Sequence, residues 1–217
     1  NNPSSITKME AFVKGLFQVQ DESSMLVAKV LDPKPNELAV DVCSAPGGKA
    51  THIAELMQNK GQVIARDIHE HKIKLIKDAA LRLGIDIINA EIFDAQKEDV
   101  NLRGKADRVL VDAPCTGLGI IRRKPDIKWT RDVKDLEEIV KLQEKILYAA
   151  SRYVKPGGVL VYSTCTIEPK ENEELVRKFI KDNREFELED ISNLLPDGLK
   201  KDTAKEGYIQ LYPNIDG

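Results

Sequence analysis

The sequence predicts a doubly wound α/β fold, with helices on both faces of a mostly parallel sheet. Short apolar, β-branched runs recur along most of the chain, and amphipathic helical patterns lie between them. Such alternation is typical of βαβ units. The runs predicted as buried strands are residues 38–42, 63–65, 85–88, 108–111 and 159–162. The segments predicted as helices are residues 23–31, 50–58, 70–83, 132–154 and 171–181.

Glycine, proline and charge set the ends of these elements. Gly61 and Gly84 follow two of the predicted helices, at the position where a helix C-terminus favours glycine. The sequence Pro156-Gly157-Gly158 is predicted to end the long helix. The acidic stretch of residues 168–174 is interpreted as a helix start that the helix dipole favours.

Composition limits the class of protein. The 217 residues carry 33 Lys and Arg against 36 Asp and Glu, a balance that does not by itself indicate nucleic-acid binding. No apolar run approaches the ~20 residues of a membrane-spanning helix. Cys43, Cys115 and Cys165 are too sparse for a disulfide framework or a zinc site. We therefore expect reduced thiols, no metal, no membrane contact and a monomer in the cytoplasm.

The loop after the first strand has the features of a cofactor site. Open α/β sheets bind ligands at the carboxyl ends of their strands, and the first strand is followed by Cys43-Ser44-Ala45-Pro46-Gly47-Gly48-Lys49. Paired glycines allow a ligand close to the backbone, and the next helix offers free N–H groups. Asp67, at the end of the second strand, can accept hydrogen bonds from both hydroxyls of a ribose. A nucleoside-bearing cofactor is therefore predicted.

S-adenosylmethionine suits this loop better than NAD or ATP. The dinucleotide pattern G-x-G-x-x-G is absent. The phosphate loop G-x-x-x-x-G-K-[ST] fails because Cys43 stands at its first glycine and Ala50 follows Lys49. The alternative is that the glycines form only a tight turn and that Asp67 is a solvated strand end.

Two cysteines follow the fourth and fifth strands. One lies in the sequence Asp112-Ala113-Pro114-Cys115 and the other in Thr164-Cys165. These strands are neighbours in a doubly wound sheet, so we expect both thiols to face the cleft of the cofactor loop. A lone cysteine is usually part of a core, but two at adjacent strand ends indicate chemistry.

A thiol beside a methyl donor suits methylation at C5 of a cytosine. A thiolate that adds to C6 raises the electron density at C5, which then attacks the sulfonium methyl, and loss of the C5 proton expels the thiolate. The site should lower the pKa of that thiol, since an ordinary cysteine is only a few per cent thiolate at neutral pH. Asp112 can hydrogen-bond N3 and the amino group of the ring. The residues alone do not decide which cysteine attacks.

These motifs resemble those of the NOL1/NOP2/Sun family of RNA cytosine-C5 methyltransferases. The matching segments are residues 41–49, 112–115 and 164–165, followed by Pro169-Lys170-Glu171-Asn172-Glu173. Residues 121–129 resemble the branch that acts on bacterial small-subunit rRNA. The resemblance implies a Rossmann-like fold of class I S-adenosylmethionine-dependent methyltransferases. It also implies RNA, most simply 16S rRNA, as the partner.

The resemblance further implies a role for each matching residue. Cys165 matches the nucleophile and Cys115 the thiol that helps to release the product. Cofactor contacts are implied for Cys43, Ser44, Ala45, Pro46, Gly47, Gly48, Lys49, Asp67, Asp94 and Asp112. RNA contacts are expected at Arg122, Arg123, Lys124, Lys128, Trp129 and Arg131. Without the family match, a solvated loop explains this basic run equally well.

The predicted activity is transfer of a methyl group from S-adenosylmethionine to C5 of a cytidine through a covalent bond between Cys165 and C6. A tRNA substrate, a non-catalytic ribosome-assembly factor and an NAD-dependent oxidoreductase are the alternatives. Residues 1–36 are interpreted as the last stretch of an N-terminal RNA-binding region, and residues 37–217 as the catalytic domain. Members of the family end with an apolar strand after an Asp-Gly pair, so we expect this chain, which ends at Asp216-Gly217, to be shortened.

Overall fold

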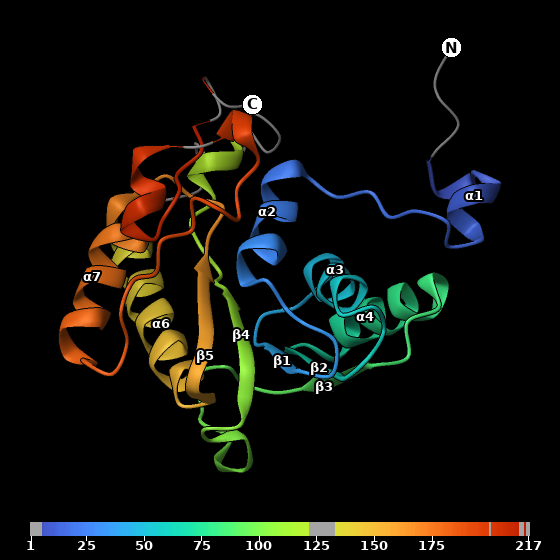
Figure 1. The fold of residues 1–217 in the computed structure, drawn as a ribbon, viewed down its shortest axis with the longest axis horizontal. Coiled ribbons are helices and arrows are strands. Elements are labelled where there is room, and N and C mark those ends of the chain that lie inside the picture. Colours follow the sequence, from blue (N-terminus) through green and yellow to red (C-terminus); the bar gives the residue numbers. More distant parts are fainter. Residues whose placement is uncertain (1–5, 122–132, 200, 213–214, 216–217) are drawn as a thin grey trace.

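A computed structural model describes residues 6–121, 133–199, 201–212 and 215. Its centre is a five-stranded parallel sheet in the order β3-β2-β1-β4-β5 (Figure 1). The strands are β1 (Leu38–Asp41), β2 (Gln62–Asp67), β3 (Ile88–Ile92), β4 (Ala106–Asp112) and β5 (Val154–Ser163). The strand order steps outward from β1 in both directions, which confirms the predicted doubly wound fold.

Helices cover both faces of this sheet. Helices α6 and α7 lie on one face, and α3 and α4 lie on the other with α2 beside them (Figure 1). The α-helices are α1 (Glu10–Val13), α2 (Glu22–Leu31), α3 (Gly48–Leu56), α4 (Glu70–Leu83), α6 (Val133–Ser151) and α7 (Glu173–Asp182). Short 3₁₀ turns include η3 (Leu118–Ile120) and η4 (Pro169–Glu171). In the described part of the chain, none of the helices has the length and apolar character to cross a membrane.

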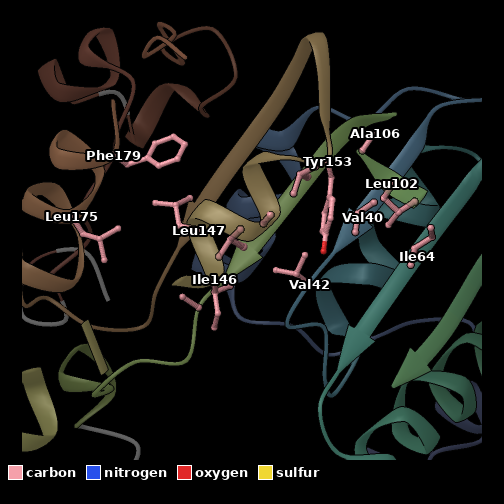
Figure 2. Packing of buried hydrophobic residues seen from close by; sticks show 14 residues of the cluster. Val40, Val42, Ile64, Leu102, Ala106, Ile146, Leu147, Tyr153, Leu175 and Phe179 are labelled. Carbon is pink, nitrogen blue, oxygen red and sulfur yellow. The ribbon is translucent and has the colours of Figure 1, made fainter. Parts of the chain in front are cut away.

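The core is divided between the two faces by the alternation of each strand. Val109 of β4 belongs to the cluster with Leu147 of α6 and Phe179 of α7, part of which Figure 2 shows. Leu110, the next residue, packs on the opposite face with Ile53 of α3. Because both faces are buried, the central strands are continuous apolar runs. Packing on both faces therefore fixes the direction in which the chain continues beyond the end of β4.

Polar residues end the strands on one edge of the sheet. Asp41 ends β1, Asp67 ends β2 and Asp112 ends β4. Asp112 is paired in register with Ser163, the last residue of β5. Because parallel strands share a direction, these side chains gather at the carboxyl edge, where open α/β sheets bind ligands.

The boundary predicted for the third strand is wrong. The sequence predicts residues 85–88, but β3 is Ile88–Ile92. Ile85 and Ile87 pack against the buried cluster in the connection that precedes the strand. β3 itself is an edge strand with partly exposed faces, so it lacks the continuous apolar run of a central strand.

The end predicted for the long helix is also wrong. Helix α6 ends at Ser151, and Pro156-Gly157-Gly158 lies inside β5. Three residues of β4 there face six of β5, because Ala106 pairs with Val154 and Arg108 with Val159. The proline and glycines therefore form a bulge in a strand, a position where both residue types are tolerated.

Candidate active site

The turn after β1 depends on one glycine. Gly47 has a φ of +105°, and a Cβ added there would lie 3.1 Å from the Cα of Ile76 in α4. The position therefore disfavours any residue with a side chain. Gly47 is also the N-cap of α3, so the first N–H groups of this helix lie at the carboxyl edge of the sheet.

A buried acid lies beneath this turn. Asp41 is fully buried, and burial, followed by the Asp112 carboxylate, raises the pKa of Asp41 to about 7. Neither carboxylate oxygen of Asp41 nor the hydroxyl of Ser44 forms a hydrogen bond of ordinary geometry with the described residues. An unsatisfied buried polar group costs about 1–3 kcal/mol. These three oxygens therefore have capacity for a further polar partner.

Asp67 and Asp94 follow neighbouring strands at the same edge. The Oδ1 atom of Asp67 accepts a hydrogen bond from the His69 N–H at 3.0 Å, and its Oδ2 lies 3.5 Å from the Lys72 Nζ. Asp94 follows β3, and its Oδ1 accepts from the Gln96 N–H at 3.1 Å. Both carboxylates thus stabilise the turns that carry them and retain capacity for further donors.

Lys49 and Asp112 form an ion pair at the centre of this edge. The Lys49 Nζ lies 2.6 Å from Oδ2 of Asp112, and the Ser163 hydroxyl donates to Oδ1 at 2.7 Å. The three residues come from α3, β4 and β5. Sequence reasoning named Lys49 and Asp112 separately but did not predict that they pair. The two contacts fix the orientation of the Asp112 carboxylate on both oxygens.

The structure brings Cys115 and Cys165 into contact. Their Sγ atoms lie 3.0 Å apart, and the Cys165 N–H donates to the Cys115 Sγ at 3.3 Å. Cys165 is exposed, whereas Cys115 is partly buried. Gly119 supports the Cys165 loop, because its N–H donates to the Cys165 carbonyl at 3.1 Å and an added Cβ would lie 2.8 Å from that oxygen.

The contact between the thiols makes them chemically different. The hydrogen bond from Cys115 lowers the pKa of the Cys165 thiol to about 7 although partial burial opposes this. The same hydrogen bond raises the pKa of Cys115 far above the ordinary value. The contact therefore shifts the two pKa values in opposite directions and makes Cys165 the more acidic thiol of the pair.

A cleft of about 1800 Å³ adjoins these groups. Lys49, Asp112 and Cys165 line it at one end, and it continues along β5 and α7. β5 is the last strand of the sheet, and no described strand pairs with its outer side. Cys165 therefore lies at one end of an extended cleft.

The sequence pattern does not predict the burial of one acidic residue, Glu171. Glu173 and Glu174 do start α7, as the acidic stretch predicts, but Glu171 is fully buried in η4 and accepts hydrogen bonds from Thr116 and Gln143. Its only signal in the sequence is its place in the Pro-Lys-Glu-Asn motif. The predicted RNA-contact segment, residues 122–131, lies outside the described residues.

Comparison with known proteins places this geometry in a family. The family model for 16S rRNA methyltransferase RsmB/F matches residues 28–217. A probable ribosomal RNA small subunit methyltransferase B of Bacillus subtilis is 48% identical over 95% of this chain and 46% of its own length. A tRNA (cytosine(72)-C(5))-methyltransferase of Pyrococcus horikoshii is 39% identical over 86% of this chain and 47% of its own length.

Solved structures agree with this result. The structure of NSun6 from Pyrococcus horikoshii with SFG superposes with a TM-score of 0.73 at 37% identity, over 82% of this chain and 46% of that chain. This similarity supports the predicted Rossmann-like fold of class I methyltransferases and argues against an oxidoreductase. The chain spans about half the length of the relatives that it matches. It belongs to the 16S rRNA methyltransferase RsmB/F family.

Proposed function

We propose that this chain transfers a methyl group from S-adenosylmethionine to C5 of a cytidine in RNA, with Cys165 as the nucleophile. The main support is the contact between Cys115 and Cys165 at 3.0 Å, which gives one thiol a lowered pKa at one end of a large cleft. Membership of an rRNA methyltransferase family supplies the class of reaction. Neither observation alone would identify the target carbon.

The residues at the end of β1 fit the proposed cofactor. Its ammonium group is a suitable partner for the unsatisfied oxygens of Asp41 and Ser44. Asp67 and Asp94 have acceptor capacity for the nucleoside at the ends of β2 and β3. When bound, S-adenosylmethionine supplies an electrophilic methyl group on a sulfonium. The related NSun6 structure was determined with SFG, an analogue of S-adenosylmethionine.

Cys165 and Asp112 would activate the base. The Cys165 thiolate adds to C6 of the flipped cytosine, forming an Sγ–C6 bond and moving an electron pair toward C5 and N3. Asp112 is held in place by Lys49 and Ser163, and in this position it can accept a hydrogen bond from the amino group, while its protonated form can donate to N3 as the ring gains charge. After methylation, loss of the C5 proton restores the ring and breaks the Sγ–C6 bond.

Cys115 would assist the release of the product. The hydrogen bond to Cys165 raises the pKa of Cys115 most, followed by burial and by the negative charge of Cys165. Once Cys165 is bonded to C6, that hydrogen bond and that charge are gone, so Cys115 can release its proton to solvent in the cleft more readily. The resulting thiolate lies where it can act as a base during elimination.

The substrate is proposed to be 16S rRNA. The family description and the name of the Bacillus subtilis relative support this choice. The Pyrococcus horikoshii relative, named for cytosine 72 of tRNA, supports tRNA as the second candidate. Both candidates require the same chemistry from the chain. We further propose that residues 1–36 continue an RNA-binding region and that residues 122–131 contact the RNA backbone.

A trapping experiment tests the mechanism. Cys115→Ala should allow Cys165 to attack but slow its release, so RNA should remain covalently attached when the variant is expressed in cells. We expect a nuclease-sensitive band of lower mobility on a denaturing gel, absent from Cys115→Ala/Cys165→Ala. Sequencing the attached RNA then separates rRNA from tRNA.

Incorporation of a labelled methyl group separates the ways in which the proposal can fail. If the unmodified chain methylates RNA but Cys115→Ala traps none, the roles of the two thiols are wrong. If Cys165→Ala methylates RNA as well as the unmodified chain does, the covalent mechanism is wrong. A chain that supports ribosome assembly equally well with Cys165→Ala is an assembly factor.

A further inference from the structure

One buried carboxylate connects three separate segments of the chain. Glu171 is fully buried at the end of η4. Its Oε2 accepts hydrogen bonds from the Thr116 N–H at 2.9 Å and from the Gln143 Nε2 at 2.8 Å, and its Oε1 accepts from the Thr116 hydroxyl. The donors come from the loop after β4 and from α6, whereas Glu171 itself follows the loop after β5.

These donors hold Cys115 from both sides. Thr116 is the residue that follows it, and both its N–H and its hydroxyl bind Glu171. Gln143 also donates from Nε2 to the carbonyl of Pro114, the residue that precedes Cys115, at 2.9 Å. The backbone on each side of Cys115 therefore has a hydrogen bond to this network.

The network also reaches the Cys165 loop. The hydroxyl oxygens of Thr116 and Thr166 lie 3.0 Å apart, and Thr166 follows Cys165 directly. A carboxylate only accepts hydrogen bonds, so the Thr116 hydroxyl must donate to Glu171. It follows that the Thr166 hydroxyl donates to Thr116. One carboxylate thus fixes the direction of the hydrogen bonds that join the two cysteine loops.

A buried charge is a costly way to build a core. No described Lys or Arg forms an ion pair with Glu171. Burial of a carboxylate costs several kcal/mol before its hydrogen bonds compensate, and apolar residues of similar volume often stabilise such sites at least as well. A leucine or methionine, however, could not hold the backbone of the Cys115 loop.

We propose that Glu171 is a positioning residue that holds Cys115 at hydrogen-bond distance from Cys165 and so keeps Cys165 reactive. The importance of this reactivity for catalysis rests on the proposed function, but the geometric effect does not. The titratable and charged groups that face Cys165 are Cys115 and Asp112 from the end of β4 and Lys49 from α3. Of these, Cys115 is the group whose position Glu171 controls.

The test is the pH dependence of alkylation by iodoacetamide, measured for the Cys165 peptide by mass spectrometry. Glu171→Ala removes the acceptor of three hydrogen bonds, so Cys115 should withdraw and the alkylation profile should move at least one pH unit upward. Alkylation at pH 7 should then slow roughly tenfold, as the thiolate fraction approaches that of an ordinary cysteine. RNA and S-adenosylmethionine are not needed, so the result is independent of the proposed function.

Two further variants separate positioning from general stability. Glu171→Gln should restore the profile to within about half a pH unit, because its amide oxygen can accept both N–H donors while its NH₂ donates to the Thr116 hydroxyl oxygen. Glu173→Ala is the matched control, because Glu173 is exposed and pairs only with Arg177 among the described residues. It should leave the profile unchanged.

A lowered melting temperature without a shifted profile in Glu171→Ala would show that the carboxylate is only structural and would overturn the proposal. If Glu171→Ala does not fold, Thr116→Val provides the test. This nearly isosteric change removes the hydroxyl between Glu171 and Thr166, and it should slow alkylation of Cys165 about threefold at pH 7. An unchanged rate in Thr116→Val would equally contradict the proposed role.

Discussion

Cys43 and Cys165 follow two strands of one sheet at the same edge, yet their surroundings give them opposite chemistry. Cys43 follows β1, where burial raises the pKa of its thiol and the Asp41 and Asp112 carboxylates raise it further. Cys165 lies behind β5, where the hydrogen bond from Cys115 lowers its pKa to about 7. A place at the ligand-binding edge therefore does not make a cysteine reactive. A hydrogen-bond donor aimed at its sulfur lowers the pKa of the thiol and so favours the thiolate.

The largest expected effect is the loss of activity in Cys165→Ser. The substitution keeps the shape of the side chain but replaces a thiol of lowered pKa with a hydroxyl that stays protonated at neutral pH. Methylation of RNA should fall on the order of 10³-fold or more, as expected when a nucleophile is removed. Transfer of a labelled methyl group measures this, with Cys43→Ser as the matched control. Comparable losses in both variants would remove the distinction between the two thiols.

Sequence patterns predict well the sheet that carries Cys43 and Cys165. Buried strands with apolar faces on both sides produce the runs that locate β1, β2, β4 and β5, and a doubly wound topology makes β4 and β5 neighbours. That topology also leads to the expectation that the two cysteine loops lie near each other. β3 is displaced because it is an edge strand without a continuous apolar run.

The contacts between side chains within the site are harder to predict from the sequence. The pairing of Lys49 with Asp112 spans 63 residues, and the hydrogen bond of Thr116 to Glu171 spans 55. Such contacts depend on the angles at which loops leave the sheet, and those angles are set by tertiary packing. Glu171 belongs to an acidic run, so its pattern in the sequence favours a solvated helix start. Only its burial in the structure shows that it is different.

An intermediate effect is expected from substitution of Asp41, one of the acids that raise the pKa of Cys43. Asp41 has a pKa of about 7 in the folded chain against an ordinary 3.8, so the folded state binds this proton more tightly. Its favourable contribution is complete below pH 4 and is lost as the pH rises toward 7 and above. Asp41→Asn should therefore be increasingly stabilising from pH 4 to pH 8, by at most on the order of 4 kcal/mol.

Urea unfolding of both chains at several pH values measures this difference. The stability of Asp41→Asn relative to the unmodified chain should rise with pH and level off above about pH 8. A difference that is constant with pH would mean that Asp41 titrates normally in the folded state. In that case the carboxylate has a partner outside the described residues.

The smallest effect is expected at Cys43 itself. Its raised pKa leaves almost no thiolate at pH 7.5, so iodoacetamide should alkylate the Cys165 peptide at least about 30-fold faster than the Cys43 peptide. Cys43→Ala should accordingly change the alkylation of Cys165 by less than about twofold. Cys43 also packs against the buried cluster that contains Val42, so alanine should cost only about 1 kcal/mol of stability. Mass spectrometry of both peptides in one reaction provides an internal standard. Equal alkylation of the two cysteines would contradict this comparison. It would show that the carboxylates around β1 do not suppress the thiolate of Cys43, and that the contact with Cys115 does not make Cys165 more reactive.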